Sequence, residues 1–310
     1  MRILVTGGAG FIGSHVADDL IQAGHQVLVV DDFSTGRREN LPEAAAFEQI
    51  DIRDGEAVIA VSKDFGPQCI CHQAAQTSVA VSTREPIRDA EINVVGTLNL
   101  LQAALSVGVE RFVFASTGGA VYGEVPNGQR ASVGTAPRPL SPYACSKFAV
   151  EGYLEAYRFE HGLDYQILRY ANVYGPRQDP HGEAGVVAIF SERLLAGQQL
   201  QINARRSEGD GGCVRDYVYV ADVVRANRLA LEGALGPKIV NICSAQGTST
   251  LELAQALGVA VGVTPQLRFA GRRPGDVERS VLDAADYLRQ FPATTLEQGL
   301  AETVAWFRSR

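Results

Sequence analysis

The chain has 310 residues, a formal net charge of −7 at pH 7, 46% apolar residues and 20% charged residues. This composition is typical of a globular protein with enough apolar side chains for a substantial core. An acidic chain offers no basic field to nucleic acid or to an anionic membrane, and it contains no apolar run long enough to span a bilayer. We therefore expect neither nucleic acid nor a membrane among its partners.

The five cysteines are dispersed and odd in number, which favours free thiols in a reducing compartment over a disulfide framework. The five histidines are scattered without the spacing of metal ligands, so we expect no metal site. Glycines interrupt the N-terminal apolar run too early for a signal peptide. The sequence thus predicts a cytoplasmic location.

The N-terminal stretch MRILVTGGAGFIGSH predicts a strand, a glycine turn and a helix. Residues 3–5 are apolar and branched, and an apolar helical pattern runs from Phe11 to Gly24. Unpaired amide groups and the positive end of the helix dipole make such a turn an anion site. We expect it to hold the pyrophosphate of a dinucleotide, with the contacts made by Gly7, Gly10, Phe11, Ile12 and Gly13.

The next predicted strand, residues 27–30, ends at Asp31. An acidic side chain at this place accepts hydrogen bonds from both hydroxyls of the adenosine ribose and repels a 2′-phosphate. The sequence therefore predicts NAD rather than NADP as the cofactor.

Strands and helices alternate through the first half of the chain. The predicted strands are 3–5, 27–30, 47–50, 69–72, 112–115 and 166–168, and the longest predicted helices are 87–105 and 143–160. This alternation predicts an α/β fold with a doubly wound parallel sheet, which binds ligands beyond the carboxyl ends of its strands. We expect a dinucleotide-binding domain over 1–174 and a smaller α/β substrate lobe over 175–310. Within that lobe, about 215–245, with a helix at 220–231 and a strand at 239–242, is expected to return to the first domain.

Catalytic chemistry is indicated by hydroxyl groups at a strand end and by a capped helix. Ser116 and Thr117 follow the strand at 112–115, and SPYACSK places Tyr143 and Lys147 at i and i+4 on one helix face. An ammonium beside a phenol lowers the pKa of the phenol, and the phenolate can take a proton from a substrate hydroxyl. We expect Tyr143 to be the base and Lys147 to support it while bridging to the nicotinamide ribose.

Together, TGGAGFIGS, the Ser-Thr strand end and SPYACSK resemble the extended short-chain dehydrogenase/reductase family, over essentially the whole chain. LRYANVYGPRQDP, RDYVYVADVVRAN and RRPGDVERS are similar to its nucleotide-sugar epimerase branch, above all to enzymes that interconvert UDP-galactose and UDP-glucose. The resemblance implies a Rossmann domain and inversion at C4 through a 4-keto sugar, with NAD regenerated in each turnover.

The resemblance also assigns residues by matching position. Besides the glycine turn, the expected NAD-binding residues at the adenosine are Asp31, Asp32 and Phe33 at the ribose and Asp51 and Ile52 at the adenine. Those expected near the nicotinamide are Ala74, Ala75, Gln76, Asn93 and Tyr170, together with Ser116, Tyr143 and Lys147. The expected substrate-binding residues are Thr117 at the sugar 4-hydroxyl, Asn172, Arg215 and Arg273 at the diphosphate, Asp276 at the nucleoside ribose, and Ser280 near the sugar 2-position. The expected partners are a UDP-sugar and a second copy of the chain, because the family dimerises through its Tyr/Lys helix and the long helix before Ser116.

Several alternatives remain open at this point. Gly118-Gly119 stand where 4,6-dehydratases carry an Asp-Glu pair, which disfavours dehydration. A UDP-glucuronate 4-epimerase or decarboxylase would need a cation for the sugar carboxylate, and another nucleotide-sugar dehydrogenase would consume NAD. A dinucleotide-sensing binding protein would lack the Tyr/Lys pair. A small Ser280 in place of a bulkier tyrosine predicts room for an N-acetyl group, while Asn203, where some members stack an aromatic ring on uracil, leaves the base open.

Overall fold

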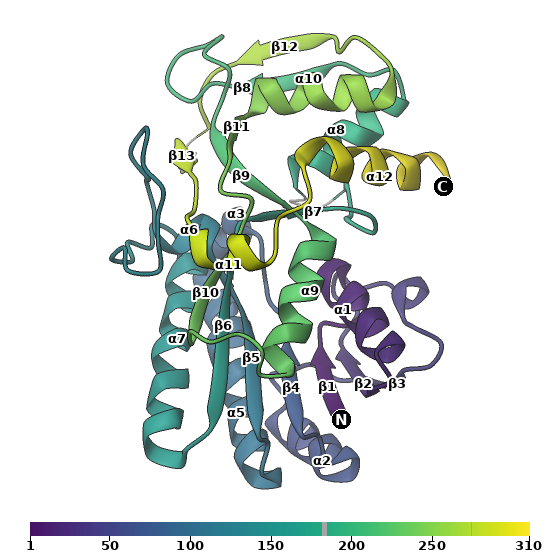
Figure 1. Cartoon of the computed structure of the whole chain (residues 1–310), viewed down its shortest axis with the longest axis vertical. Helices are drawn as coiled ribbons and strands as arrows, with labels where there is room; N and C mark the ends of the chain where they lie inside the picture. The colour runs from purple at the N-terminus through teal and green to yellow at the C-terminus, as the bar shows by residue number, and fades with distance from the viewer. Residues whose placement is uncertain (182–184, 274) are drawn as a thin grey trace. The chain divides into compact units, whose positions relative to one another are not determined.

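The computed structural model of the chain describes residues 1–181, 185–273 and 275–310 (Figure 1). Its first strand, β1 (Arg2–Thr6), lies inside a seven-stranded sheet. The strand order is β10-β6-β5-β4-β1-β2-β3, and the strands from β5 to β3 pair in parallel. The other strands are β2 (Gln26–Asp31), β3 (Ala46–Gln49), β4 (Cys69–His72), β5 (Arg111–Thr117), β6 (Asp164–Tyr170) and β10 (Ile239–Ile242). The predicted parallel sheet is confirmed, and its order reverses between β1 and β4, where such sheets bind ligands.

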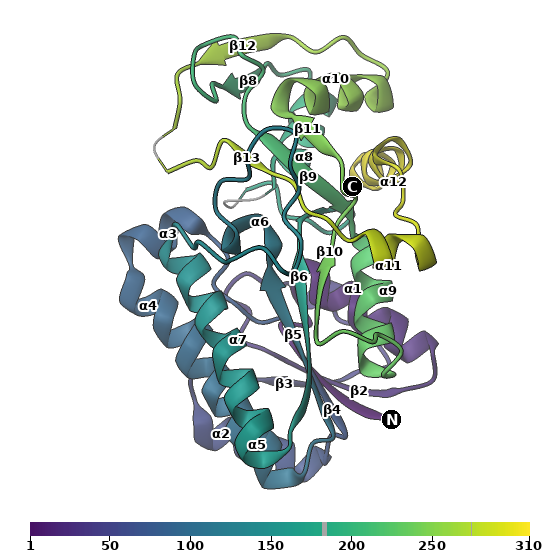
Figure 2. The same ribbon diagram turned by 60° about the vertical axis from the view of Figure 1, so that its left-hand side comes forward.

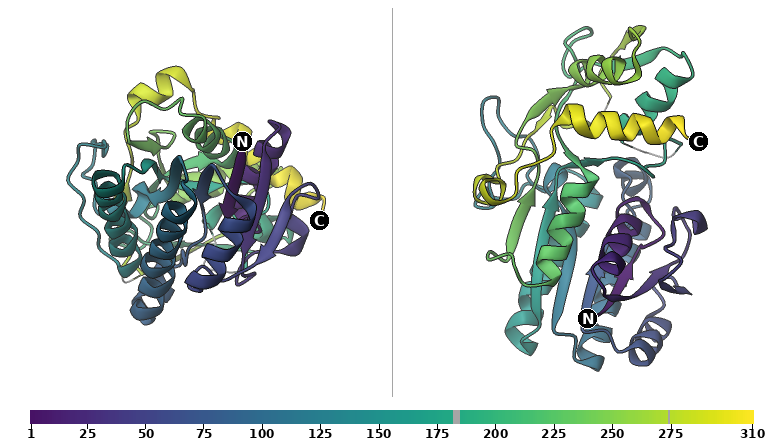
Figure 3. Two further views of the ribbon diagram at one scale, coloured as in Figure 1. Left: turned by 90° about the horizontal axis from the view of Figure 1, so that it is seen from below. Right: turned by 45° about the vertical axis from the view of Figure 1, so that its right-hand side comes forward.

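Helices cover both faces of this sheet, as Figure 2 shows: α2, α5 and α7 lie on one face, and α1 and α9 lie on the other. The right-hand view of Figure 3 shows α1 and α9 side by side, and Arg228 of α9 pairs with Asp19 of α1 at 3.0 Å. The helices are α1 (Phe11–Gln22), α2 (Gly55–Phe65), α3 (Val79–Arg84), α4 (Pro86–Ala90), α5 (Gly96–Val107), α7 (Pro142–His161) and α9 (Val220–Leu231), with a 3₁₀ turn η1 (Arg38–Asn40) and a π-helical turn η2 (Glu91–Val95).

The stretch Pro86–Val107, which comprises α4, η2 and α5, is long and apolar enough to cross a membrane by length and composition. In the structure its α5 part is a core helix: Leu100, Leu101, Ala103 and Ala104 are fully buried in the cluster that also holds strand residues of the sheet. Burial of one face against the sheet accounts for its apolar character.

The chain divides into two compact units. The first comprises Met1–Thr117, Pro139–Arg169 and Val223–Val240, and the second comprises Gly118–Arg138, Tyr170–Asp222 and Asn241–Arg310. Residues 118–138 thus pack with the second unit, although they precede the helix that carries Tyr143. The functional division into an NAD-binding domain over 1–174 and a substrate lobe over 175–310 stays a prediction.

The second unit is organised around β9 (Val214–Tyr219). This strand pairs antiparallel with β11 (Gly247–Ser249) and parallel with β13 (Arg279–Ser280) and β7 (Asn172–Tyr174). β8 (Leu200–Asn203) pairs with β12 (Leu267–Ala270) in a separate parallel ladder. The helices are α6 (Gly118–Val121), α8 (Val186–Leu195), α10 (Thr250–Val261), α11 (Ala285–Gln290) and α12 (Leu296–Arg308). Capping boxes at Ser249 and Thr295 start α10 and α12.

Candidate functional site

The glycine turn after β1 is built by close backbone contacts. Gly7 has a φ of +68° and donates its amide hydrogen to Val30 O at 2.8 Å. A Cβ on Gly7 would lie 2.6 Å from the Ala74 amide nitrogen, and one on Gly13 would lie 2.1 Å from the Gly7 oxygen. Glycine is therefore needed at both positions to bring the turn, β4 and the start of α1 together.

The N-terminus of α1 is open to an anion. Gly10 is its N-cap and no side chain caps it, nor does its first turn carry an acidic residue. The amide groups of the first turn and the positive end of the helix dipole therefore remain for a ligand such as a pyrophosphate. These features fit the predicted dinucleotide.

Asp31 ends β2 and is buried. Its Oδ2 accepts a hydrogen bond from the Ala9 amide at 3.0 Å, and its Oδ1 accepts one from the Phe33 amide at 2.8 Å. Burial raises its pKa, and the two backbone bonds counteract the shift. Because a carboxylate has about four acceptor positions, these contacts orient Asp31 and leave capacity for ribose hydroxyls. Asp32, by contrast, is exposed.

The two residues expected at the adenine, Asp51 and Ile52, differ in their surroundings. Asp51 pairs with Arg53, whose Nη2 lies 2.5 Å from Asp51 Oδ2, and this contact lowers the pKa of Asp51. Ile52 is buried beside Gly96, where an added Cβ would lie 2.7 Å from Ile52 Cδ1. The site therefore offers one apolar residue and one carboxylate already held by an arginine.

The segment after β4 is fixed by hydrogen bonds. The Ala74 amide donates to Thr6 Oγ1 at 3.2 Å, and Thr6 Oγ1 lies 2.7 Å from His72 Nδ1. The Gln76 amide donates to Asn93 Oδ1 at 2.9 Å, while Asn93 Nδ2 donates to Gln76 O at 2.9 Å. Asn93 lies on η2, and π-helical turns inside α-helices are frequent at functional sites. The structure thus brings together Gln76 and Asn93, two of the residues that were expected near the nicotinamide.

The helix that carries the expected base begins as predicted. Ser141 caps α7 by accepting a hydrogen bond from the Ala144 amide at 3.2 Å, and Pro142 is its first residue. The Tyr143 hydroxyl is hydrogen-bonded to the Thr117 side chain, and Lys147 Nζ donates to Ala115 O at 2.9 Å. Thr117, Tyr143 and Lys147 therefore share one site in the first unit.

The charge state of this site corrects one expectation. Burial raises the pKa of Tyr143 to about 12, although the bond to Thr117 counteracts it. Burial lowers the pKa of Lys147 to about 8. The prediction that the ammonium of Lys147 lowers the pKa of the phenol toward neutrality is therefore wrong, because burial disfavours the charged phenolate.

Ser116 also lies at the end of β5, but its side chain is hydrogen-bonded away from Tyr143 and Lys147. Its Oγ donates to Glu151 Oε1 at 2.5 Å, and Glu151 forms a buried ion pair with Arg169. A hydroxyl engaged in this way supports the sheet–helix contact. Its assignment to the cofactor stays a prediction.

The substrate residues of the second unit gather around β9. Arg215 and Ser280 are register partners in the β9–β13 ladder, and Asn172 Nδ2 donates to Asp216 O at 3.1 Å. Arg273 Nε pairs with Asp276 Oδ2 at 3.1 Å. Burial raises the pKa of the Cys213 thiol, two residues before Arg215.

Two further site residues, one expected at the substrate and one at the cofactor, are buried. Ser280 is 1% exposed, and its Oγ has no hydrogen-bond partner within residues 1–181, 185–273 and 275–310. Tyr170 ends β6 and is buried. The roles of Asn172, Arg215, Arg273, Asp276, Ser280 and Tyr170 in ligand binding stay predictions.

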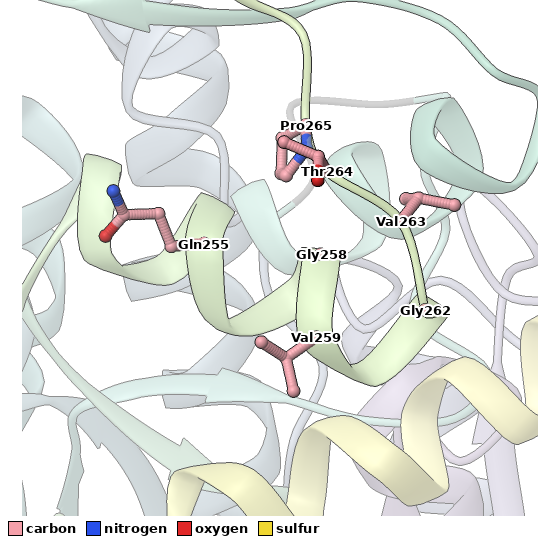
Figure 4. A pocket seen from close by; sticks show the side chains of 7 residues that line it. All are labelled: Gln255, Gly258, Val259, Gly262, Val263, Thr264 and Pro265. Carbon is pink, nitrogen blue, oxygen red and sulfur yellow. The ribbon is translucent and has the colours of Figure 1, made fainter.

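Two surface pockets lie in the second unit. One, of about 500 Å³, is lined by charged side chains and a short loop: Glu124, Val125, Pro126, Asn127, Arg205, Arg206, Arg272, Glu278 and Arg279. The other, of about 350 Å³, lies at the end of α10 between Gln255 and Pro265, as Figure 4 shows. No predicted site residue lines either pocket, so we assign neither of them to the candidate site.

Sequence reasoning missed the buried polar groups that connect the predicted residues, chiefly Asp89, Ser146 and His72. Asp89 accepts hydrogen bonds from Gln76 and Asn93 at 2.8 and 3.0 Å and from Ser146 at 2.6 Å. The available signal was a carboxylate four residues before Asn93, which places both side chains on one face of a helix.

Comparison with known proteins agrees with this geometry. Residues 3–243 match the NAD dependent epimerase/dehydratase family. The chain is 46% identical to the UDP-glucose 4-epimerase of Mycolicibacterium smegmatis, with 100% of this chain and 99% of that protein covered. Among solved structures, it is similar to the UDP-glucose 4-epimerase of Thermus thermophilus in complex with NAD, with 51% identity, a TM-score of 0.95 and 99% of each chain covered.

A second structure, the UDP-glucose 4-epimerase of Thermotoga maritima with UDP-glucose, is 47% identical with a TM-score of 0.93, covering 100% of this chain and 99% of the other. These similarities extend over the whole chain and confirm both the predicted Rossmann-type fold and the predicted resemblance. The chain belongs to the NAD dependent epimerase/dehydratase family.

Proposed function

We propose that the chain is an NAD-dependent UDP-glucose 4-epimerase that interconverts UDP-galactose and UDP-glucose. The observation that carries this conclusion is the grouping of Thr117, Tyr143 and Lys147 in a chain 51% identical, over 99% of its length, to an enzyme of that activity. This agrees with the function, enzyme class and cofactor predicted from the sequence.

The residues of the chain have distinct tasks in this reaction. NAD, when bound, supplies the acceptor of the C4 hydride and returns the hydride afterwards. Tyr143 Oη takes the proton of the sugar 4-hydroxyl, and Thr117 orients that hydroxyl through the hydrogen bond it shares with Tyr143. Lys147, fixed to Ala115 O, places a positive charge where the phenolate forms.

Retention of substrate through the second half-reaction requires residues that hold the nucleotide portion. The 4-keto sugar must turn its other face to the site while its nucleotide diphosphate stays bound. Arg215 and Arg273 would hold the diphosphate, and Asp276 would hold the nucleoside ribose. Arginine suits this task because its planar fork matches phosphate oxygens.

The alternatives named from the sequence are disfavoured by particular residues. A binding-only protein has no need of the Tyr143–Thr117 hydrogen bond beside Lys147. A 4,6-dehydratase needs an acid and a base after Thr117, where this chain has Gly118 and Gly119. The experiment that tests the proposal is to incubate the purified protein with UDP-galactose and catalytic NAD and to separate the nucleotide sugars. Formation of UDP-glucose without accumulating NADH supports it, and untouched UDP-galactose in protein that binds NAD would refute it.

We further propose that the protein is a homodimer, that it is cytoplasmic and that it serves galactose metabolism. Of the apolar side chains on the two helices of the expected dimer contact, Leu101 and Leu154 are fully buried in the core, whereas Phe148 is 38% exposed. Tyr153 and Phe159 on the same helix are also exposed, at 42% and 83%. These side chains support a dimer through α7, which sedimentation of wild type and Phe159→Lys would test.

A further inference from the structure

Asp89, on the short helix α4, is a carboxylate with 0% exposure that the proposed mechanism does not use. Its Oδ1 accepts hydrogen bonds from Gln76 Nε2 at 2.8 Å and from Asn93 Nδ2 at 3.0 Å, and its Oδ2 accepts one from Ser146 Oγ at 2.6 Å. Burial of a carboxylate is costly unless hydrogen bonds or charges compensate it. A fully buried carboxylate that accepts three side-chain hydrogen bonds therefore calls for a structural or functional explanation.

The three partners of Asp89 belong to the two halves of the candidate site. Gln76 and Asn93 are hydrogen-bonded to each other and are expected near the nicotinamide. Ser146 lies on α7, one residue before Lys147 and three after Tyr143. Asp89 is thus a single group that ties the cofactor-side segment to the helix of the base.

The charge of Asp89 also reaches the reacting pair. It raises the pKa of both Tyr143 and Lys147, against the effect of burial on Lys147. Glu151, a buried carboxylate on α7, forms an ion pair with Arg169 that balances its charge. Burial keeps the pKa of His72 on β4 low, so that the ring is neutral.

The remaining charged groups on the elements packed against α4 are exposed and screened by water. On α3, α4 and η2 they are Arg84, Arg88 with its partner Glu85, and Glu91 with its partner Arg53. On α7 they are Glu155, Arg158, Glu160 and His161, all near its C-terminal end, and the same helix carries the exposed thiol of Cys145. Asp89 is therefore the group best placed to bias the charge of Tyr143 and Lys147 from outside the pair.

We propose that Asp89 is a positioning residue: its carboxylate holds Gln76 and Asn93 in register with α7 and sets the electrostatic balance between Tyr143 and Lys147. This inference rests on the proposed function, because it assigns Asp89 a role in the same reaction. The proposed role has two parts that can be tested separately. The hydrogen bond from Ser146 connects Asp89 to α7, and the negative charge of the carboxylate acts on Tyr143 and Lys147.

The test is Asp89→Asn, which preserves the shape of the side chain and can keep all three hydrogen bonds. In NAD-loaded protein, the ultraviolet absorbance of the Tyr143 phenolate, taken as the difference from the matching Tyr143→Phe protein, is titrated against pH. We expect the titration midpoint to move to lower pH, since a negative charge that opposed ionisation is gone. The acidic and the alkaline limb of the kcat–pH profile should also move to lower pH, because Lys147 loses the negative charge that stabilises its ammonium group. A midpoint and limbs that stay in place would overturn the proposal.

Two further variants separate charge from structure. Ser146→Ala removes the link to α7 and keeps the charge, so kcat should fall about tenfold with its pH limbs unmoved. Glu91→Gln removes an exposed charge two residues away and should leave both readouts at wild-type values. If Ser146→Ala left kcat unchanged, the mechanical part would be refuted.

The titration also distinguishes this inference from the proposed function. Tyr143 titrates whether or not UDP-galactose is the substrate. Failure of turnover with a shifted midpoint would refute the substrate assignment alone, whereas normal turnover with an unshifted midpoint would refute the role of Asp89 alone.

Discussion

Tyr143 and Lys147 lie one turn apart on α7, yet burial moves their pKa values in opposite directions, to about 12 for the phenol and about 8 for the ammonium. Both shifts have the same cause, since a desolvated site disfavours the charged form of either group. The pair is therefore poised to respond to a further positive charge, such as the oxidised nicotinamide ring of NAD, which would favour the phenolate.

Tyr143→Phe should lower kcat by about 100- to 10,000-fold, the usual contribution of a positioned acid–base group. NAD binding, measured by equilibrium dialysis or fluorescence, should persist because the glycine turn and Asp31 are intact. Tyr153→Phe is the matched control, since this tyrosine is 42% exposed on the same helix. Comparable activity in the two variants would remove Tyr143 from the mechanism.

The rate should fall as pH rises above about 8. The pKa of Lys147 is lowered from 10.5 to about 8, so its positive charge is present below that pH and lost above it. Lys147→Arg keeps a charge at high pH and should move the alkaline limb of kcat upward, though at a lower maximum because the guanidinium is larger. An alkaline limb at the same pH in both proteins would assign the titration to another group.

Asp31→Asn should weaken NAD binding by about tenfold, because hydrogen bonds to a charged acceptor contribute about 1.5–3 kcal/mol. The ratio of NADP to NAD affinity should rise, as the repulsion of a 2′-phosphate is removed. Asp64→Asn, on the exposed face of α2, controls for the loss of one negative charge. Unchanged discrimination in Asp31→Asn would show that selectivity lies elsewhere.

Gly7→Ala should cost more stability and more NAD affinity than Gly24→Ala. Both glycines have a positive φ, +68° and +83°, so both substitutions carry backbone strain of about 1–3 kcal/mol. A Cβ at Gly24 meets nothing within 4 Å, whereas one at Gly7 would lie 2.6 Å from the Ala74 nitrogen. Thermal unfolding and NAD titration compare the two, and equal losses would show that the close approach to β4 is unimportant.

Ser280→Tyr should lower turnover of UDP-N-acetylglucosamine relative to UDP-glucose, if a small residue there leaves room for an N-acetyl group. The ratio of the two activities is the appropriate measure, because a tyrosine at a position 1% exposed also strains the fold. Ser280→Ala keeps the space and should preserve the ratio. An unchanged ratio in the tyrosine variant would end the hypothesis.

The first half of the fold could be predicted because its local patterns agree with its tertiary structure. The predicted strand 27–30 became Gln26–Asp31, and the helix predicted over 143–160 became Pro142–His161, with the cap where Ser141 indicated it. The predicted helix 87–105 exists but contains the π-helical turn η2, which covers only Glu91–Val95 and is too short to be recognised from periodicity.

The candidate site was predictable where side chains follow a local motif and not where they act through distant partners. Tyr143, Lys147 and Asp31 are marked by spacing within a few residues. The direction of Ser116 toward Glu151, and the role of Asp89 between Gln76 and Ser146, depend on contacts over 13 to 57 residues of sequence. The error over the pKa of Tyr143 has the same origin, since desolvation is set by packing and not by spacing.

The central claim is that C4 is inverted by removal and return of its own hydride within one active site. The most direct measurement uses UDP-galactose carrying deuterium at C4, incubated with the purified protein in ordinary water, with the product examined by mass spectrometry and NMR. The account predicts UDP-glucose that retains deuterium at C4. Loss of the label to water, or its appearance in free NADH, would contradict it.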